Sequence, residues 1–158
     1  FRGPLEDVLS RFLGCMSHYD LESGIRICGD SPLIAPSIVD EIIRLFEVAG
    51  DSVDIVTNVS NKTFPKGQSA ELITRDALIR LSSMQLSSSE REHVTSGFYS
   101  RQTDFRMKSF ELKESKRHLS FVVDQEDELQ ELKKFLESEP HPSMKHLDLF
   151  NQFEQYYF

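Results

Sequence analysis

The chain has 158 residues, of which 39% are hydrophobic and 28% are charged, and its formal net charge is −8 at pH 7. A chain of this length is typical of a single domain and can bury a hydrophobic core without a disulfide or a metal. The acidic balance argues against a nucleic-acid partner, and no apolar run approaches the roughly 20 residues that span a membrane. The two cysteines, Cys15 and Cys28, are too few for a disulfide framework, so we expect reduced thiols in a cytoplasmic protein.

The first third of the sequence alternates between helical and strand patterns. Apolar residues recur at helical spacing over 5–19 and 38–50, which predicts two amphipathic helices. The short apolar segments 24–30 and 53–59 are predicted to be strands, and the second is rich in β-branched residues. The predicted inward-facing residues are Leu5, Val8, Leu9, Phe12, Leu13 and Met16 in the first helix, and Ile38, Ile42, Leu45 and Phe46 in the second, which we expect to end at Gly50.

The rest of the chain continues this alternation after a polar loop over 60–67. Ser89 and Glu92 have the spacing of a capping box, so a helix should follow them. The remaining predicted elements are strands over 68–73, 105–112 and 118–124, and helices over 75–82, 90–100, 126–139 and 143–158. Pro140 and Pro142 separate the last two helices. The predicted inward-facing residues of these two helices are Leu129, Leu132 and either Phe135 or Leu136, and then Leu147, Phe150, Phe153 and Tyr157.

These elements predict one α/β domain over 1–158 with a C-terminal helical tail over 143–158. The strands at 25–29, 53–59 and 119–123 are apolar on both faces, a pattern typical of sheets that helices cover on both sides. The expected architecture is therefore three layers, helix–sheet–helix, around a mixed and mostly parallel sheet.

Two aspartates stand where ligands bind in such folds. Asp30 ends the predicted strand 24–30, and Asp124 ends the predicted strand 118–124. If the two strands are neighbours, their carboxylates converge at the edge of the sheet where ligands bind. One or two carboxylates together with phosphate oxygens are the usual ligands of Mg²⁺. The alternative is that each aspartate caps the loop or helix that follows its strand.

Other familiar catalytic patterns are absent from the sequence. The seven glycines never cluster, so there is no G-x-G-x-x-G motif and no P-loop to cradle phosphates. The five histidines have no zinc-site spacing, and neither cysteine has a nearby histidine that would suggest a nucleophile. His93 lies near the start of a predicted helix, where the surrounding acidic residues could serve only to match the helix dipole.

Several motifs occur in a fixed order along the chain. They are FRG with EDVLSRF at 1–12, RICGDSPLI at 26–34, DIVTN at 54–58, TFPKG with Glu71 at 63–71, EREHVT at 90–95, VDQED at 123–127 and PHPSMKHLDLF at 140–150. In this order they resemble the cytidylyltransferases that make CMP-activated acidic sugars. The resemblance is strongest to the spore-coat polysaccharide (SpsF-like) branch, which is related to the KDO and acylneuraminate cytidylyltransferases. It covers essentially the whole chain.

The resemblance implies a nucleotide-diphospho-sugar-transferase-like fold, and a reaction in which a sugar hydroxyl attacks the α-phosphorus of CTP and releases pyrophosphate. The process it implies is the biosynthesis of a cell-surface or spore-coat polysaccharide. On the matching positions, Asp30 and Asp124 are implied to be catalytic residues and ligands of Mg²⁺. The residues implied to line the nucleotide or sugar pocket are Arg26, Asn58, Gly67, Glu71, Glu92 and His93.

The chain departs from the family pattern in two places. The Gly-rich R-x-x-S-x-R-L-P-G-K loop of the family, which supplies the triphosphate cradle, has no counterpart before Phe1. Ser120-Phe121-Val122 stands where the branch usually has an arginine before its T-V-D sequence. We therefore expect the chain to be the C-terminal two-thirds of such an enzyme and to turn over poorly by itself.

A different class of function stays open, namely a non-catalytic binding or assembly domain that keeps the fold without the nucleotide loop. The aromatic segment LFNQFEQYYF at 149–158 could dock a partner or form a homodimer with a second copy. Alternatively, this segment packs on its own sheet.

Overall fold

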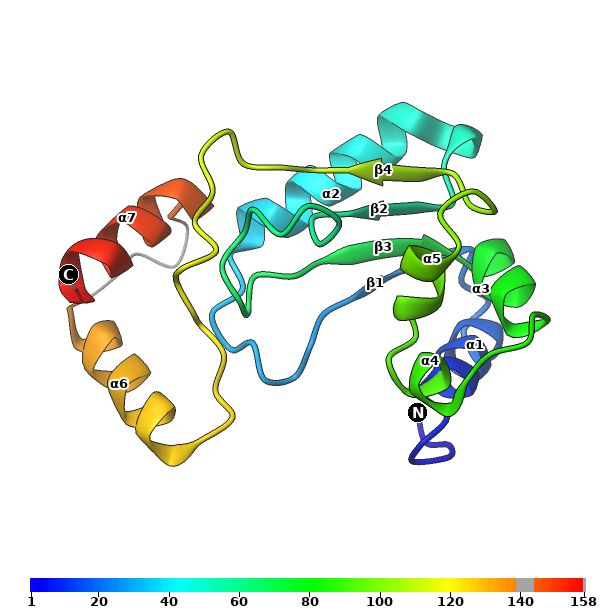
Figure 1. Cartoon of the computed structure of the whole chain (residues 1–158), viewed down its shortest axis with the longest axis horizontal. Coiled ribbons are helices and arrows are strands. Elements are labelled where there is room, and N and C mark those ends of the chain that lie inside the picture. The colour runs from blue at the N-terminus through cyan, green and yellow to red at the C-terminus, as the bar shows by residue number, and fades with distance from the viewer. Residues whose placement is uncertain (139–143, 158) are drawn as a thin grey trace.

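A four-stranded mixed sheet forms the centre of the fold in the computed structural model, which describes residues 1–138 and 144–157. Its strands are β1 (Ser23–Arg26), β2 (Ile55–Thr57), β3 (Glu71–Thr74) and β4 (Met107–Ser109), in the spatial order β1-β3-β2-β4. β3 runs antiparallel to both of its neighbours, whereas β2 and β4 are parallel. Three of the four strands therefore end at one edge of the sheet, which we call the carboxyl edge; the opposite edge is the amino edge (Figure 1).

The predicted mixed sheet is confirmed, with one qualification about the pairing of its strands. Most of the strands share one direction, as expected, but two of the three pairings are antiparallel. The reason is that β3, the strand of opposite direction, lies between β1 and β2 and is not an outermost strand of the sheet.

The helices within the described residues are α1 (Val8–His18), α2 (Pro36–Ala49), α3 (Arg75–Ser82), α4 (Ser88–Glu92), α5 (Ser96–Ser100), α6 (Glu126–Glu137) and α7 (His146–Tyr157), with a 3₁₀ turn η1 at Gly50–Ser52. The Thr74 hydroxyl accepts a hydrogen bond from the N–H of Ala77 at 3.2 Å, so α3 begins where the sequence predicts. Pro36 occupies the first turn of α2, and Gly50, with φ of +52°, ends it as predicted. The expected burial of Leu5 is wrong: this residue precedes the cap of α1 and is 83% exposed.

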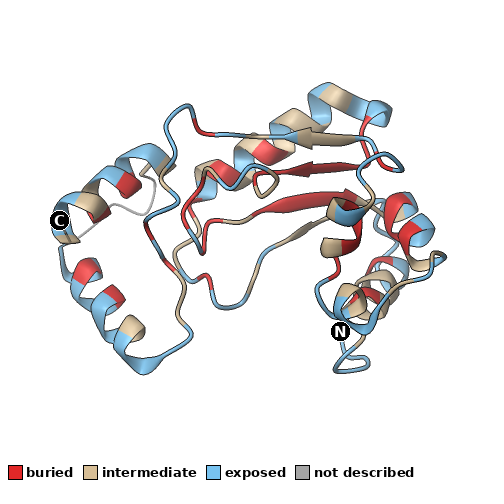
Figure 2. Cartoon of the chain, in the orientation of Figure 1, coloured by how far each residue is buried: buried red, intermediate tan, exposed pale blue. Residues whose placement is uncertain are grey.

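The two faces of the sheet bury two separate sets of side chains. Ile55 of β2 lies opposite Ile73 of β3, and both pack against α1 and α3. Val56 and Leu72, the next pair, point to the other face, where they pack against α2, because successive strand residues face opposite sides. Both sets are almost fully buried (Figure 2), and each such side chain stabilises the fold by roughly 1.5–3 kcal/mol. The three predicted layers are therefore present.

The predicted capping box lies two residues earlier than expected. The S-x-x-E spacing occurs twice, and the structure uses Ser87 with Glu90 instead of Ser89 with Glu92. The Ser87 hydroxyl accepts from the N–H of Glu90 at 3.2 Å, and the Glu90 carboxylate accepts from the N–H of Ser87 at 2.9 Å. The sequence spacing alone does not distinguish the two boxes.

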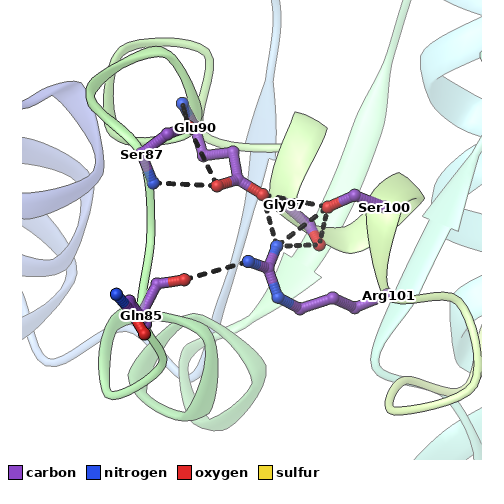
Figure 3. Close-up of polar contacts among 6 residues, drawn as sticks. All are labelled: Gln85, Ser87, Glu90, Gly97, Ser100 and Arg101. Atoms are coloured by element: carbon purple, nitrogen blue, oxygen red, sulfur yellow. Dashed lines mark hydrogen bonds and ion pairs between the residues drawn. The ribbon is translucent and has the colours of Figure 1, made fainter.

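The single helix predicted over 90–100 is also wrong, because the chain forms α4 and α5 with a turn between them. Val94 in this turn has φ of +47°, a left-handed conformation that an α-helix cannot include. Arg101, which follows α5, pairs with the Glu90 carboxylate and donates to the carbonyl oxygen of Gln85 at 3.0 Å (Figure 3). These contacts hold the end of α5 against the start of α4.

The strand predicted over 118–124 is not present, and the segment has one parallel bridge, between Lys66 and Ser120. Its apolar character has another cause. The ring of Phe121 packs on α7, with its centroid 4.2 Å from that of Phe153. The segment is apolar because it is sandwiched between a loop and a helix, and not because it lies in the sheet.

The C-terminal helices complete the core instead of extending from it. Phe135 of α6 and Phe150 and Phe153 of α7 are buried in the cluster that also contains the inner residues of α2. The aromatic C-terminal segment therefore packs on its own domain, at the end of the molecule where Figure 1 shows α6 and α7. Leu147, which was expected to face inward, is 48% exposed because it lies to the side of the buried stripe.

Parts of two predictions lie outside the described residues. These are the helix break at Pro140 and Pro142 and the first and last residues of the tail over 143–158. Of the helices in residues 1–138 and 144–157, none has the length and apolar character needed to cross a membrane.

Candidate functional site

The carboxyl edge holds a hollow of about 330 Å³ that both predicted aspartates line. We call it the first hollow. Its wall comes from the segment after β1, from the loop between β2 and β3, and from the segment before α6, with the residues Cys28, Asp30, Ser31, Lys66, Gly67, Ser69, Ser120, Val122, Asp124 and Glu128. The two aspartates, 94 positions apart in the sequence, are thus brought to one site.

Backbone contacts bring Asp124 to this edge without a strand. The N–H of Val123 donates to the carbonyl oxygen of Asp30 at 2.9 Å, and the N–H of Phe121 donates to the carbonyl oxygen of Lys66 at 2.9 Å. Gly67 is needed at the closest approach. Its φ is +79°, and a Cβ there would lie 2.7 Å from the carbonyl carbon of Phe121. The predicted site residue Gly67 therefore joins two walls of the first hollow.

Neither aspartate caps a helix. The N–H groups of Asp124 and Gln125 both donate to Glu128, at 2.7 and 2.9 Å, so Glu128 serves the start of α6. The Asp30 carboxylate accepts from the hydroxyl of the adjacent Ser31 at 2.9 Å. Among the ion pairs of residues 1–138 and 144–157, none involves Asp30 or Asp124. Two exposed carboxylates thus line one hollow, and no cation of the described residues is paired with either.

The donor set of the first hollow limits which cation it could hold. The described part of the chain contains no cluster of three or more His, Cys, Asp or Glu side chains suited to a metal. A cation at Asp30 and Asp124 would therefore complete its coordination with water or with oxygens of a ligand. This arrangement fits Mg²⁺, which prefers hard oxygen ligands and commonly binds through one or two carboxylates plus phosphate oxygens.

A second hollow of about 340 Å³ adjoins the first and shares Lys66 and Ser69 with it. Three cationic side chains, those of Lys62, Lys66 and Arg117, line it, and none of them forms an ion pair within the described residues. Sequence reasoning missed Lys62 and Arg117, because no spacing links the polar loop over 60–67 to the charged turn that contains Arg117. The carboxyl edge thus combines a carboxylate-lined hollow with a cation-lined one.

Asn58, another predicted site residue, also lines the second hollow. Asn58 is buried, and its side-chain amide forms two hydrogen bonds with the backbone. Nδ2 donates to the carbonyl oxygen of Gln68 at 2.6 Å, and Oδ1 accepts from the N–H of Ala70 at 2.9 Å. Asn58 therefore closes the loop between β2 and β3, which carries Lys62, Lys66 and Gly67.

Arg26 and Glu71 form an ion pair across β1 and β3, where they are register partners, with 2.9 Å between Nη1 and Oε2. The Glu71 side chain is 1% exposed, and that of Arg26 is 21% exposed. Glu71 also accepts a hydrogen bond from Tyr99, a residue that sequence reasoning missed because its helix, α5, was predicted as part of a longer one.

The predicted site residues Glu92 and His93 lie apart from these hollows. Both are exposed, at the end of α4, and neither lines the first or the second hollow. α4 contacts α1, on the right of Figure 1, whereas the loops of the carboxyl edge lie to its left.

The motif residue Asp54 lies at the amino edge, just before β2, and its charge is fully paired. Its two carboxylate oxygens contact Arg106 and Arg80, each at 2.8 Å, and its side chain is 3% exposed. Burial by itself would raise the pKa of Asp54, but the hydrogen bonds from Arg106 and Arg80 lower this pKa to about 2.

Known proteins resemble the chain in sequence and in fold, although no protein-family model matches it. It is 29% identical to an uncharacterised protein of Methanocaldococcus jannaschii over 153 residues, and this match covers 96% of this chain and 58% of that protein. It is 31% identical to the spore coat polysaccharide biosynthesis protein SpsF of Bacillus subtilis over 96 residues, and this match covers 60% of this chain and 38% of SpsF. The chain thus spans less than two thirds of the length of these relatives.

Among solved structures, a cytidylyltransferase from Leptospira borgpetersenii superimposes with a TM-score of 0.92 at 24% identity, over 99% of this chain and 66% of the other. The chain has a cytidylyltransferase fold. A second structure, CMP:2-keto-3-deoxy-manno-octonic acid synthetase complexed with CTP, matches with a TM-score of 0.57 at 13% identity, over 84% of this chain and 68% of the other. The cytidylyltransferase fold and the similarity to SpsF agree with the family resemblance found in the sequence motifs.

Proposed function

We propose that this chain forms the metal-binding and acceptor-binding part of a cytidylyltransferase, which transfers CMP from CTP to a hydroxyl of an acidic sugar for polysaccharide biosynthesis. In this reaction the sugar oxygen bonds to the α-phosphorus of CTP, the bond from that phosphorus to the β-phosphate oxygen breaks, and pyrophosphate and the hydroxyl proton are released. The observation that carries the proposal is the meeting of Asp30 and Asp124 in one hollow at the carboxyl edge of a cytidylyltransferase fold.

In the proposed site, Asp30 and Asp124 would hold Mg²⁺ through their carboxylate oxygens. Both are exposed to the first hollow and lack a paired cation in the described chain, so they suit this role. When bound, Mg²⁺ neutralises charge on the phosphate oxygens of a nucleotide. The synthetase structure that was solved with CTP supports CTP as this nucleotide.

The second hollow supports an acidic acceptor. Lys62, Lys66 and Arg117 offer it three positive charges that have no ion-pair partner among residues 1–138 and 144–157, in a chain whose net charge is −8. A carboxylate on the sugar would be attracted to this hollow. Because Lys66 and Ser69 line both hollows, the second hollow lies next to the proposed metal site. The chain's own residues would thus orient the acceptor beside the nucleotide, and orientation is a large part of the catalysis of phosphoryl transfer.

Calorimetric titration of the chain with CTP, with and without Mg²⁺, tests the proposal. We expect Mg²⁺-dependent CTP binding that Asp30→Asn and Asp124→Asn each weaken at least tenfold, because each removes one charged metal ligand. Asp40→Asn is the matched control, since Asp40 is an exposed aspartate of α2 and does not line either hollow.

Release of pyrophosphate with a panel of acidic sugars is the second measurement, and we expect it to be slow for this chain alone. CTP binding that is absent, or that is indifferent to Mg²⁺ and to both aspartates, would contradict the proposal. That result would favour a binding or assembly domain that keeps only the fold.

A further inference from the structure

A series of part-buried hydrogen bonds connects Arg26 to the loop that lines both hollows. The Tyr99 hydroxyl donates to the Glu71 carboxylate, whose other oxygen lies 2.9 Å from Nη1 of Arg26. On its other side, the Tyr99 oxygen lies 2.7 Å from the Thr57 hydroxyl, which accepts from the N–H of Val59 at 3.0 Å. These hydrogen bonds thus form one continuous path that connects β1, β3, α5 and β2.

The two ends of this path fix the direction of every hydrogen bond in it. A backbone N–H can only donate and a carboxylate can only accept. Since Tyr99 uses its one hydroxyl proton toward Glu71, the Thr57 hydroxyl must donate its proton to the Tyr99 oxygen. The order is therefore Val59 N–H to Thr57, Thr57 to Tyr99, and Tyr99 to Glu71, so both hydroxyl protons of the path are used within it.

Tyr99 keeps the proton that this path requires. Burial raises the pKa of its hydroxyl, and the negative charge of Glu71 and the hydrogen bond to it raise the pKa further. The hydroxyl is therefore a permanent donor at neutral pH. The Glu71 carboxylate has one oxygen bound by Tyr99 and the other by Arg26, and it is 1% exposed, so it has no surface to offer to a ligand.

Arg26, in contrast, has donors to spare. A guanidinium carries five N–H groups on three nitrogens, and within the described residues only Nη1 of Arg26 makes a hydrogen bond. The side chain is 21% exposed and belongs to the last residue of β1, at the carboxyl edge. Cys28 and Asp30, which follow in the chain, line the first hollow. A guanidinium held on one side with its other side free suits a phosphate group.

We propose that Tyr99 is a positioning residue, which through Glu71 holds Arg26 for a phosphate group and through Thr57 holds the start of the loop between β2 and β3. The identity of that phosphate as part of CTP or of released pyrophosphate rests on the proposed function. The positioning role of Tyr99 does not depend on the proposed function, because it follows from the hydrogen bonds of Tyr99 with Glu71 and Thr57.

A double-mutant cycle on the full chain tests this inference, with inorganic pyrophosphate as the probe and calorimetry as the measurement. We expect Arg26→Gln to weaken pyrophosphate binding about tenfold or more. Tyr99→Phe should weaken it about threefold to tenfold, because it removes the hydrogen bond that holds the Glu71 carboxylate, which in turn orients the guanidinium. The double variant should bind as weakly as Arg26→Gln alone, since Tyr99 acts through Arg26. The matched controls are Tyr19→Phe, an exposed tyrosine, and Arg44→Gln, whose exposed arginine pairs with Glu41 on α2.

The circular dichroism spectrum establishes that each variant is folded, and Glu71→Gln replaces Tyr99→Phe if the latter is not. Effects of Arg26→Gln and Tyr99→Phe that simply add would overturn the inference, because a purely structural tyrosine would act independently of Arg26. Undetectable pyrophosphate binding, or binding unchanged in Arg26→Gln, would overturn it as well. If the cycle behaves as expected while CTP does not bind, the positioning role stands and the proposed function fails.

Discussion

The amino and carboxyl edges of the sheet differ in whether their aspartates form ion pairs. At the amino edge, Asp54 is buried and contacts two arginines, so its charge is neutralised inside the protein. At the carboxyl edge, Asp30 and Asp124 share a hollow with no ion-pair partner among the described residues, although Lys66 lines the same hollow. A fully paired carboxylate stabilises the fold, whereas unpaired ones are available to a ligand. Ion-pair partners thus distinguish a carboxylate that serves the fold from those that remain available to a ligand.

Substitution of Asp54 should have the largest effect on stability. We expect Asp54→Ala to lower the free energy of unfolding by about 3 kcal/mol, because it removes a buried charge and several of its hydrogen bonds and leaves Arg80 and Arg106 without their partner. Urea denaturation measures the change. Asp30→Ala is the control and should change the free energy by less than about 0.5 kcal/mol, as expected for an exposed residue. Equal effects of the two substitutions would abolish the distinction between the edges.

The pH dependence of unfolding should sharpen the same contrast. The pKa of Asp54 is lowered from 3.8 to about 2 in the folded chain, so its stabilising contribution is complete above pH 4 and is lost as the pH falls toward 2. This loss amounts to about 2 kcal/mol. The pKa of Glu90 is also lowered to about 2, mainly by the hydrogen bond from Arg101, and it titrates in the same window.

Thermal unfolding between pH 5 and 2 should therefore be compared in the natural chain and in Asp54→Asn, which removes only one of these two groups. The variant should lose less stability over this interval than the natural chain. An identical pH profile in both proteins would show that Asp54 is not the group responsible.

A smaller loss of stability is expected at the carboxyl edge, where backbone contact and not charge holds the walls together. Gly67→Ala should lower the free energy of unfolding by roughly 1–2 kcal/mol, because alanine is strained at a φ of +79° and its Cβ would press on the backbone of Phe121. Gly29→Ala is the matched control, since a Cβ there meets no atom within 4 Å. The same denaturation experiment should find the two glycine variants clearly different, and equal stabilities would remove Gly67 from its role in the hollow.

Local chemistry explains which parts of the fold the sequence predicts well. The start of α3 is predictable because Thr74 directly precedes a helical pattern and caps it. The burial of Ile38 and Ile42 in the core is predictable because their spacing matches the turn of a helix. The position of Asp30 after an apolar segment predicts its place at the carboxyl edge, although β1 ends four residues before it.

Other features depend on contacts between distant residues and leave no local signal. Phe121 lies in a segment that looks like a strand because its packing partner, Phe153, is more than thirty residues away. Arg117 reaches the second hollow from a turn whose sequence is merely charged. Tyr99 lies in a stretch that favours one long helix, and only the turn at Val94 brings its hydroxyl to Glu71.

The contact between Phe121 and Phe153 links the carboxyl edge to the far end of the chain. The backbone of Phe121 presses against Gly67 on one side, while its ring packs against α7 on the other. In evolutionary terms, we expect an aromatic residue of the last helix to be constrained together with a glycine in the site loop. Positions 67, 121 and 153 should covary among homologous sequences, even though only the first lines a hollow.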